Sequence, residues 1–205
     1  MFGIAPKNIL MVVLALLAAM VVRDWSMREI SHLPGILVQE RPLQSVINDR
    51  EPFVLDDYRL RPRATFQIRA RVLSRKDYNW GTEADLSPMD LALGWGVMSD
   101  QSVLDRIDID QRSRWYFTQY DFPAPISDQD IIRHSGNMHM IPGRPWLENE
   151  VKKIRHGDIV QLNGLLVDVD SDSGWHWRTS LSREDTGNGA CEIVYLESVL
   201  IEERK

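Results

Sequence analysis

Few residues of this chain could do covalent chemistry. Cys191 is the only cysteine. A thiol becomes a nucleophile when its pKa is depressed and a histidine lies within hydrogen-bond distance. His134 and His139 in HSGNMHM are the candidate bases, and His176 is a third. The residues leave two interpretations open: a thiol- or metal-dependent hydrolase that uses Cys191 with His134 or His139, or a cysteine packed in a strand. Cys191 lies two residues before the apolar Ile193 and would share its face of a strand, which favours packing.

Three aspartates in DVDSDSG could bind a metal. Asp168, Asp170 and Asp172 occupy alternate positions, as at the start of a calcium-binding loop. An EF-hand loop also needs Gly at its sixth position and Glu at its twelfth, and this chain has Ser173 and Thr179 there. The favoured interpretation is a solvated hairpin, with the three aspartates kept as candidate ligands. We therefore expect no metal and no other cofactor.

The tripeptide DTG, residues 185–187, is similar to the active-site motif of aspartic proteases. In those enzymes the catalytic aspartate follows an apolar strand and shares a proton with a second aspartate. Here the polar SRE precedes the motif, and the chain has no second D-T/S-G. The segment is better read as a turn, since Asp and Gly are both favoured in turns.

Aromatic residues indicate a recognition surface. The chain has seven tryptophans, a residue type enriched in binding interfaces. The polar loop KDYNWGTEAD carries two aromatic side chains with few apolar neighbours, and WHWR alternates tryptophan with His and Arg. The predicted binding surface consists of Tyr78, Trp80, Trp175, His176, Trp177 and Arg178.

Composition narrows the function classes. The chain of 205 residues is 43% hydrophobic and 26% charged, which is typical of a globular protein with a core. Its net charge of -6 argues against a nucleic-acid partner, because binding nucleic acid requires a clustered basic face. A single cysteine cannot form an intramolecular disulfide, so cysteine usage does not indicate a cellular compartment.

The N-terminal segment predicts a membrane anchor. The run ILMVVLALLAAMVV, residues 9–22, contains no polar side chain and follows Lys7. It is short for a bilayer span, which takes roughly 20 residues. An uncleaved signal-anchor is favoured over a cleaved signal peptide, because the apolar run continues into Arg23 without an A-x-A site, and Trp25 suits the headgroup level. A buried core helix is the third alternative. Charges on the two flanks do not decide the orientation.

Hydrophobic periodicity predicts the elements of the remaining chain. TFQIRARVL, SRWYFTQY, WHWRTSL and ACEIVYLESVLI are typical of strands. IVQLNGLLVDV is also strand-like, and its apolar face changes near Gly164, which predicts a β-bulge there. Three segments predict short helices: LSPMDLALGWGVM with Ser87 as N-cap, ISDQDIIRH with Ser127 as N-cap, and RPWLENEVKKIRHGD ending at Gly157.

These elements predict an α+β fold. We expect an N-terminal membrane helix followed by a small curved antiparallel sheet or an OB-like, partly open β-barrel with two or three short helices. The predicted divisions are an anchor over residues 1–31, an extended tether over 32–63, where Pro and Gly interrupt any period, and a β-rich domain over 64–205.

Several stretches resemble a family of uncharacterised bacterial single-pass membrane-anchored proteins. They are HLPGILVQERPLQ, RVLSRKDYNWGTEADLSPMDLALGWGVMSD, HSGNMHMIP and GWHWRTSLSREDTGNGACE, so the similarity covers most of the chain. The resemblance implies a bacterial source and an N-terminal anchor, and it implies no activity. With the export-like N-terminus, it places the domain on the periplasmic side of the inner membrane. The expected function is therefore a membrane-tethered extracytoplasmic binding or assembly module with a protein partner, and the alternative is the hydrolase described above.

Overall fold

The strand β3 (Tyr58–Asp77) organises the fold, and it contains the predicted strand TFQIRARVL. The structure is a computed structural model that describes residues 8–9, 11–15, 17, 28–182 and 190–204. Alternate side chains of β3, Phe66, Ile68, Ala70 and Val72, are buried with at most 3% of their surface exposed. Because successive side chains of a strand point to opposite faces, one face of β3 enters the core.

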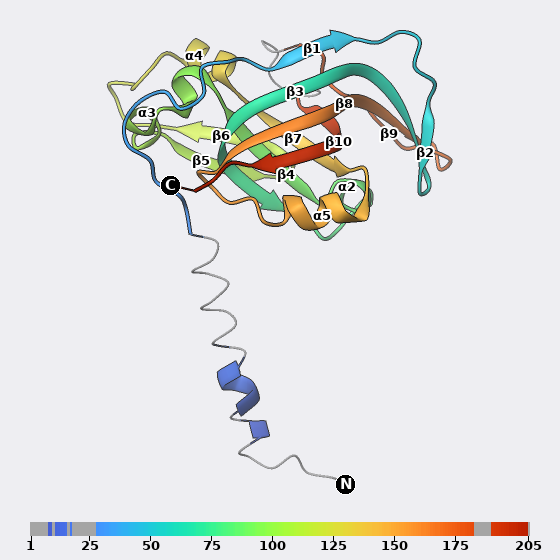
Figure 1. The fold of residues 1–205 in the computed structure, drawn as a ribbon, viewed down its shortest axis with the longest axis horizontal. Coiled ribbons are helices and arrows are strands. Elements are labelled where there is room, and N and C mark those ends of the chain that lie inside the picture. The colour runs from blue at the N-terminus through green and yellow to red at the C-terminus, as the bar shows by residue number, and fades with distance from the viewer. Residues whose placement is uncertain (1–7, 10, 16, 18–27, 183–189, 205) are drawn as a thin grey trace.

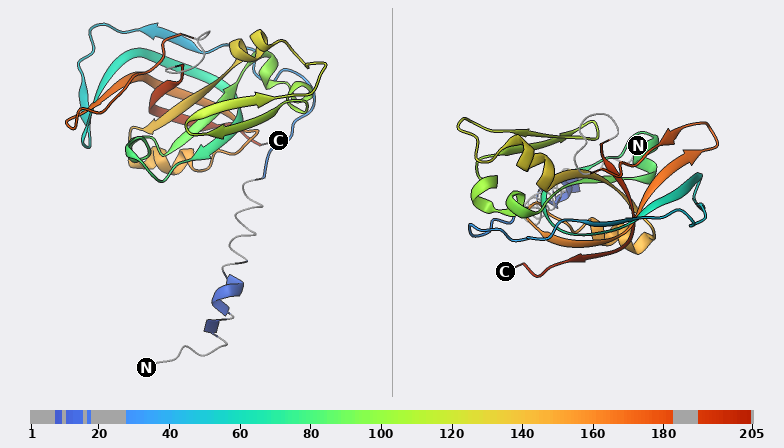
Figure 2. Two further views of the ribbon diagram at one scale, coloured as in Figure 1. Left: turned by 180° about the vertical axis from the view of Figure 1, so that it is seen from behind. Right: turned by 90° about the horizontal axis from the view of Figure 1, so that it is seen from above.

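Five strands close into a barrel around this core (Figures 1 and 2). Their spatial order is β3, β4 (Met89–Gly94), β7 (Ser135–Pro142), β10 (Glu192–Ile201) and β8 (Ile159–Ser171), and β8 pairs with β3 again. All neighbouring pairs are antiparallel except β7 and β10, which are parallel. A closed five-stranded sheet of this kind is compatible with the predicted OB-like barrel.

The barrel interior holds the main hydrophobic core. It includes Phe66, Leu91, Met138, Leu162 and Val194. The short helix α5 (Pro145–Val151), predicted from RPWLENEV, adds the buried Leu147 and Val151 to the same cluster. The helix therefore packs on the barrel core through its apolar face, which is the usual source of stability for so short a helix.

An insertion between β4 and β7 covers one side of the barrel (Figure 2). It packs on the outer surface of β3 and β4 around Leu73, Ala92 and Met98. Ser127 caps α4 by accepting a hydrogen bond from the Asp130 backbone N–H at 3.1 Å, as predicted. The predicted strand SRWYFTQY is also confirmed. The insertion consists of η1 (Gly96–Ser99), α3 (Gln101–Leu104), β5 (Asp108–Arg112), β6 (Trp115–Gln119) and α4 (Asp128–His134).

The opposite side carries β1 (Leu43–Val46), β2 (Phe53–Leu55) and β9 (His176–Trp177), as Figure 1 shows. Both β1 and β2 pair with β3. Residues 32–63, expected to be an extended tether, therefore contribute two strands and the start of a third to the sheet. Val38 in this segment is fully buried, and its carbonyl accepts a hydrogen bond from the Gly96 N–H at 2.7 Å.

The helix predicted from LSPMDLALGWGVM is wrong. Ser87 caps the C-terminus of the preceding helix α2 (Thr82–Leu86), and Met89–Gly94 form β4. All six residues of β4 are buried, and the strand pairs with β3 on one side and β7 on the other. A short apolar run suits a buried strand and a buried helix equally well, so the available strand partners decide between them.

The bulge predicted at Gly164 is also displaced. The pairing of β8 with β3 is regular through Gly164, and the register shifts lie at Pro62/Ala64 of β3 and Leu196/Ser198 of β10. The apolar face of β8 changes because both of its faces are buried there. Leu162 faces the barrel core, whereas Leu165, Val167 and Val169 belong to a second cluster outside it.

The prediction of an N-terminal membrane helix is corrected. Within the described residues, no helix has the length and apolar character needed to cross a membrane. Positions 1–7, 10, 16 and 18–27 of the predicted anchor lie outside the described residues, as does the DTG tripeptide at 185–187. The predicted strand WHWRTSL is reduced to the two residues of β9, and the predicted C-terminal strand is confirmed as β10.

Candidate functional site

Several predicted site residues line one cavity of about 510 Å³ on the outer surface of the barrel. We call this cavity the Trp177 groove. Four segments far apart in the sequence form it: α2, the turn between β5 and β6, β7, and the chain from β9 to the start of β10. Its lining consists of Glu83, Ser113, Arg114, Trp115, His139, His176, Trp177, Arg178 and Cys191.

A buried carboxylate lies next to the groove. Asp90 on β4 is opposite His139 on β7 in the sheet register, and neither side chain is more than 4% exposed. The Asp90 Oδ1 accepts hydrogen bonds from His139 Nδ1 at 2.8 Å and from Arg114 Nη1 at 2.7 Å. Because a carboxylate only accepts, Nδ1 of His139 carries the proton of that bond. In the neutral imidazole, Nε2 is then the acceptor nitrogen.

Arg114 attaches the β5–β6 hairpin to the barrel. Its guanidinium carbon lies 3.8 Å from the centre of the Tyr78 ring and 5.7 Å from that of the Trp177 ring, both within cation–π range. Its N–H donates to the Tyr78 hydroxyl at 3.0 Å, and its carbonyl accepts from Asn137 Nδ2 at 3.1 Å. Side chain and backbone together therefore hold this turn in place.

The turn itself has a strained backbone. Ser113 has a φ of 50° and Arg114 a φ of 67°, values in the left-handed region that non-glycine residues adopt at a cost. Two consecutive positive φ values suit the tight turn of a β-hairpin, because they match the right-handed twist of the strands. The contacts of Arg114 offset the strain of this conformation.

The charges of the network affect Tyr78. Burial raises the pKa of the Tyr78 hydroxyl, and the nearby Asp90 carboxylate raises it further, whereas the hydrogen bond from the Arg114 backbone lowers it. Asp90 Oδ2 is buried and makes no hydrogen bond with any described residue. The hydrogen bonds to the carboxylate from Arg114 and His139 both reach Oδ1.

Cys191 separates the Trp177 groove from a second, more apolar cavity of about 240 Å³. Its Sγ lies 3.9 Å from the Arg114 carbonyl oxygen and 3.9 Å from Asn137 Nδ2. Trp115 and Cys191 line both cavities. In the second cavity, burial raises the pKa of Tyr116 to about 12, although its hydrogen bond with Ser135 Oγ at 2.7 Å opposes this shift.

Other predicted residues lie outside the groove. Trp80 is 92% exposed, and Trp175 packs against the rings of Tyr58 and Trp177. His134 is at the end of α4, where its Nδ1 is 2.8 Å from the Asp130 carbonyl oxygen, and the structure does not bring it to the groove.

Two of the three candidate calcium ligands form ion pairs with arginines. Asp168 forms an ion pair with Arg63, and Asp170 forms one with Arg178. Asp172 is exposed. In the part of the chain that the structure describes, no group of three or more His, Cys, Asp or Glu side chains is placed to hold a metal ion.

Sequence reasoning missed Asp90 and Arg114. The only signal for Asp90 was an acidic residue within the otherwise apolar run MDLALG, which the structure places in a buried strand. A buried carboxylate requires a partner, so an aspartate in such an apolar run indicates a buried charge with a cation or a hydrogen-bond donor beside it. Arg114 carried no comparable signal, because its partners lie on β4 and in the loop after β3.

Comparisons with protein-family models, curated proteins and solved structures find no match to this chain. The candidate site therefore has to be interpreted from its own geometry.

Proposed function

We propose that this protein is a binding module that recognises a protein partner through the Trp177 groove and performs no catalysis. The observation that carries the proposal is the convergence of Trp115, Trp177 and Arg178 around one concave site. Tryptophan and arginine dominate the binding energy of many protein interfaces, and they act best in pockets that exclude water. The groove offers these side chains on rigid, hydrogen-bonded supports.

The position of the groove on the barrel supports the same proposal. It lies on the outer surface of β4 and β7, close to the connections β3–β4 and β8–β10. In OB-like barrels the corresponding surface, formed by the second and third strands and two loops, binds oligonucleotides and oligosaccharides, so the position indicates a binding site but not the class of ligand. A fold does not define a ligand, so the argument rests mainly on the side chains.

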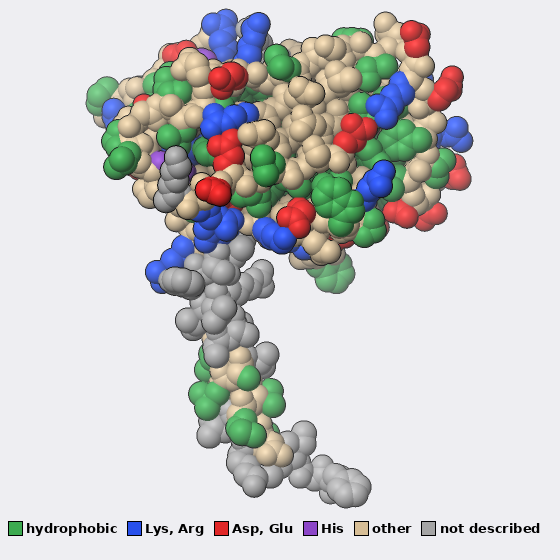
Figure 3. Space-filling model, in the orientation of Figure 1, with side chains coloured by type: hydrophobic (Ala, Val, Ile, Leu, Met, Phe, Trp, Pro, Cys, Tyr) green, Lys and Arg blue, Asp and Glu red, His purple; other side chains and the backbone are tan. Residues whose placement is uncertain are grey.

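Charge favours a protein partner over nucleic acid. The Asp90 carboxylate compensates Arg114, and Asp170 compensates Arg178. On the face in Figure 3, which is that of β3, β8 and β10 and lies away from the groove, cationic and anionic groups are also interspersed. Binding to phosphate backbones would require uncompensated Lys or Arg. The expected location outside the cytoplasm stays a prediction, since nothing in the described residues tests it.

Photo-crosslinking in intact cells tests this proposal. A benzophenone amino acid in place of Trp115, which is 36% exposed, should trap a partner protein. The matched control replaces Val54, which is 69% exposed on β2 at the other end of the molecule (Figure 1). Adding Trp177→Ala to the first variant should abolish the crosslink. Identical products at both positions, or a crosslink that survives Trp177→Ala, would contradict the proposal.

One observation favours the alternative, a thiol hydrolase. Cys191 and His139 line the same cavity, and the Asp90 hydrogen bond orients the His139 ring. In such an enzyme Cys191 would attack an acyl carbonyl, and His139 would accept the thiol proton. The His139 ring, however, is buried and its centre is 4.5 Å from that of the Trp177 ring. The metal-dependent version has no support among the described residues.

Alkylation of Cys191 separates the two functions. For a binding module, the rate with iodoacetamide should rise with pH through about 8.5, the ordinary range of a thiol. For a hydrolase, the rate should already reach its plateau below pH 7, and His139→Gln should remove that plateau. Cys191→Ser provides the background rate.

A further inference from the structure

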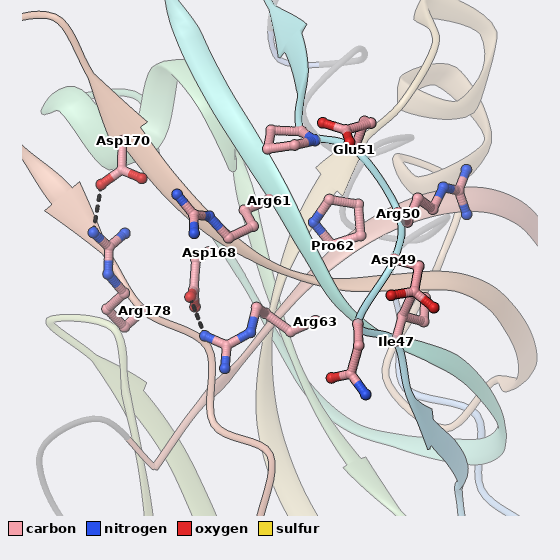
Figure 4. A pocket seen from close by; sticks show the side chains of 12 residues that line it. Ile47, Asp49, Arg50, Glu51, Arg61, Pro62, Arg63, Asp168, Asp170 and Arg178 are labelled. Carbon is pink, nitrogen blue, oxygen red and sulfur yellow. Dashed lines mark hydrogen bonds and ion pairs between the residues drawn. The ribbon is translucent and has the colours of Figure 1, made fainter.

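A second cavity of about 740 Å³ lies on the far side of Arg178 from the Trp177 groove, and Arg178 lines both. We call it the charged cleft (Figure 4). One wall comes from β3, β8 and Arg178, which directly follows β9, and the other comes from residues 47–52, which connect β1 to β2. Residues 47–52 and 61–63 of the cleft belong to the segment predicted to be a tether, and Asp168, Asp170 and Arg178 belong to the predicted β-rich domain.

The strand wall of the charged cleft is rich in arginine. Arg63 forms an ion pair with Asp168, and Arg178 forms one with Asp170. Arg61 lies between these two pairs in Figure 4, and no described residue forms an ion pair with it. With three arginines and two aspartates, this wall has a net charge of +1, and Arg61, whose register partner on β8 is Asp168, is the arginine without an ion pair.

The flanking arginines are held in position. Arg178 Nη1 donates to the Val169 carbonyl oxygen at 2.7 Å, in addition to the ion pair with Asp170. Asp168 also accepts from the Thr179 N–H at 3.1 Å. Each guanidinium has five N–H donors in a planar fork, and these contacts leave donors free for a ligand. Side chains ordered in advance lose less entropy on binding.

The opposite wall carries negative charge. Asp49 and Glu51 are exposed, and neither forms an ion pair with a described residue. Arg50 between them points away from the strand wall in Figure 4 and pairs with Glu197 at 3.3 Å. The charged cleft thus has an uncompensated cation on one wall and two uncompensated carboxylates on the other.

We infer that the charged cleft binds a small zwitterionic ligand, with its oxyanion against Arg61 and its ammonium group against Asp49 and Glu51. A simple anion would be attracted by Arg61 and repelled by the two carboxylates. A simple cation would be attracted by the two carboxylates and repelled by Arg61. Only a ligand that carries both charges gains at both walls, and guanidinium groups bind carboxylate and phosphate oxygens with paired hydrogen bonds. An amino acid, a short peptide and a phosphoethanolamine headgroup share this chemistry.

Calorimetric titration of the full chain tests the inference with two zwitterions, diglycine and O-phosphoethanolamine. At least one should bind more tightly than inorganic phosphate and more tightly than ethanolamine. Preference for O-phosphoethanolamine would assign the site to a phosphate headgroup, and preference for diglycine would assign it to a peptide or amino acid. Binding should weaken as salt is raised, because the charges are exposed.

Variants complete the test. Arg61→Gln should weaken binding about tenfold, since it removes a charge-assisted contact worth roughly 1.4 kcal/mol. The double variant Asp49→Asn, Glu51→Gln should reduce binding of the zwitterion but not of inorganic phosphate. Arg59→Gln is the matched control, because Arg59 is also exposed on β3 without an ion pair among the described residues and does not line the cleft.

Three results would overturn the inference: neither zwitterion binds, inorganic phosphate binds as tightly as they do, or Arg61→Gln behaves like Arg59→Gln. Trp115→Ala should leave this binding unchanged, because Trp115 lines the Trp177 groove and not the charged cleft. Failure here would therefore leave the proposed function standing.

Discussion

The contact between Arg114 and Asp90 should contribute strongly to stability, and Arg114→Met tests this. Methionine retains the apolar stem but removes the guanidinium that lies 2.7 Å from Asp90 Oδ1. Asp90 is fully buried, so its carboxylate would retain only the hydrogen bond from His139. Removing one partner of a buried ion pair typically costs 3–5 kcal/mol. Because the Arg114 side chain is 17% exposed, we expect a loss of about 3 kcal/mol, at the lower end of that range.

A double-mutant cycle isolates the interaction. Asp90→Asn alone leaves Arg114 without a counter-ion, but water can reach this side chain, so the expected loss is about 2 kcal/mol. In the double variant neither charge remains, and its loss should be smaller than the sum of the two by at least about 1.5 kcal/mol. Urea unfolding followed by tryptophan fluorescence measures each free energy of unfolding. An unchanged m-value would show that the unfolded state is not altered.

A neighbouring arginine provides the control. Arg112 is two residues from Arg114 and lies 3.7 Å from Asp110, but both side chains are about two-thirds exposed, at 68% and 65%. Exposed ion pairs contribute little, so Arg112→Met should cost less than about 0.5 kcal/mol. If Arg114→Met costs no more than Arg112→Met, or if the cycle is additive within about 0.5 kcal/mol, the reasoning is refuted.

Three further predictions concern packing and protonation. Gly164→Ala should destabilise the barrel by about 3 kcal/mol, because a Cβ would lie 2.0 Å from the Tyr195 carbonyl oxygen. The control Gly136→Ala should be tolerated in the same urea assay, because its Cβ would meet nothing closer than 3.7 Å. Burial lowers the pKa of His156, so the unfolded state binds more protons and stability should fall as pH drops below about 6.5, with a flatter profile for His156→Gln. Burial raises the pKa of Tyr116 to about 12, so an ultraviolet titration should show a tyrosine ionising near that pH that is missing in Tyr116→Phe.

The outcomes that contradict these predictions are equally specific. Similar stabilities for the two glycine variants would mean that β8 and β10 can separate without cost at Gly164. A pH profile for His156→Gln that is identical to that of the parent protein would exclude this histidine as the acid-sensitive group.

For Tyr116, the folded pKa lies above the unfolded value of about 10, so its contribution to stability should be present below that pH and lost as pH rises towards about 12. Full ionisation near pH 10 in the folded protein would refute its burial.

Local patterns predicted many elements correctly. The alternation in β3, the N-cap at Ser127, the apolar stripe of α5 and the apolar C-terminal strand are all confirmed. Each of these signals is contained within a few neighbouring residues, so no information about distant contacts is needed to interpret it.

The failures share one physical cause. Met89–Gly94 is a strand because β3 and β7 are available on both sides, and its sequence alone suits a helix equally well. The change of apolar face at Gly164 reflects a second cluster outside the barrel, and the bulge beside Gly164 lies in the partner strand β10 and not in β8. Residues 43–46 form β1 because β3 offers them a free edge. In every case a distant partner, which local periodicity does not contain, determined the outcome.

The same distinction applies to the candidate sites. The sequence by itself determined the reactive and aromatic residue types, among them Cys191, His139 and Trp177, and treated them as separate possibilities. Only the tertiary structure brought these three to one cavity and placed Arg114 and the buried Asp90 beside them. It also set Asp49 and Glu51 opposite Arg61 across the charged cleft. Strand register across a closed barrel decides such neighbours, and register depends on pairing between residues far apart in the chain.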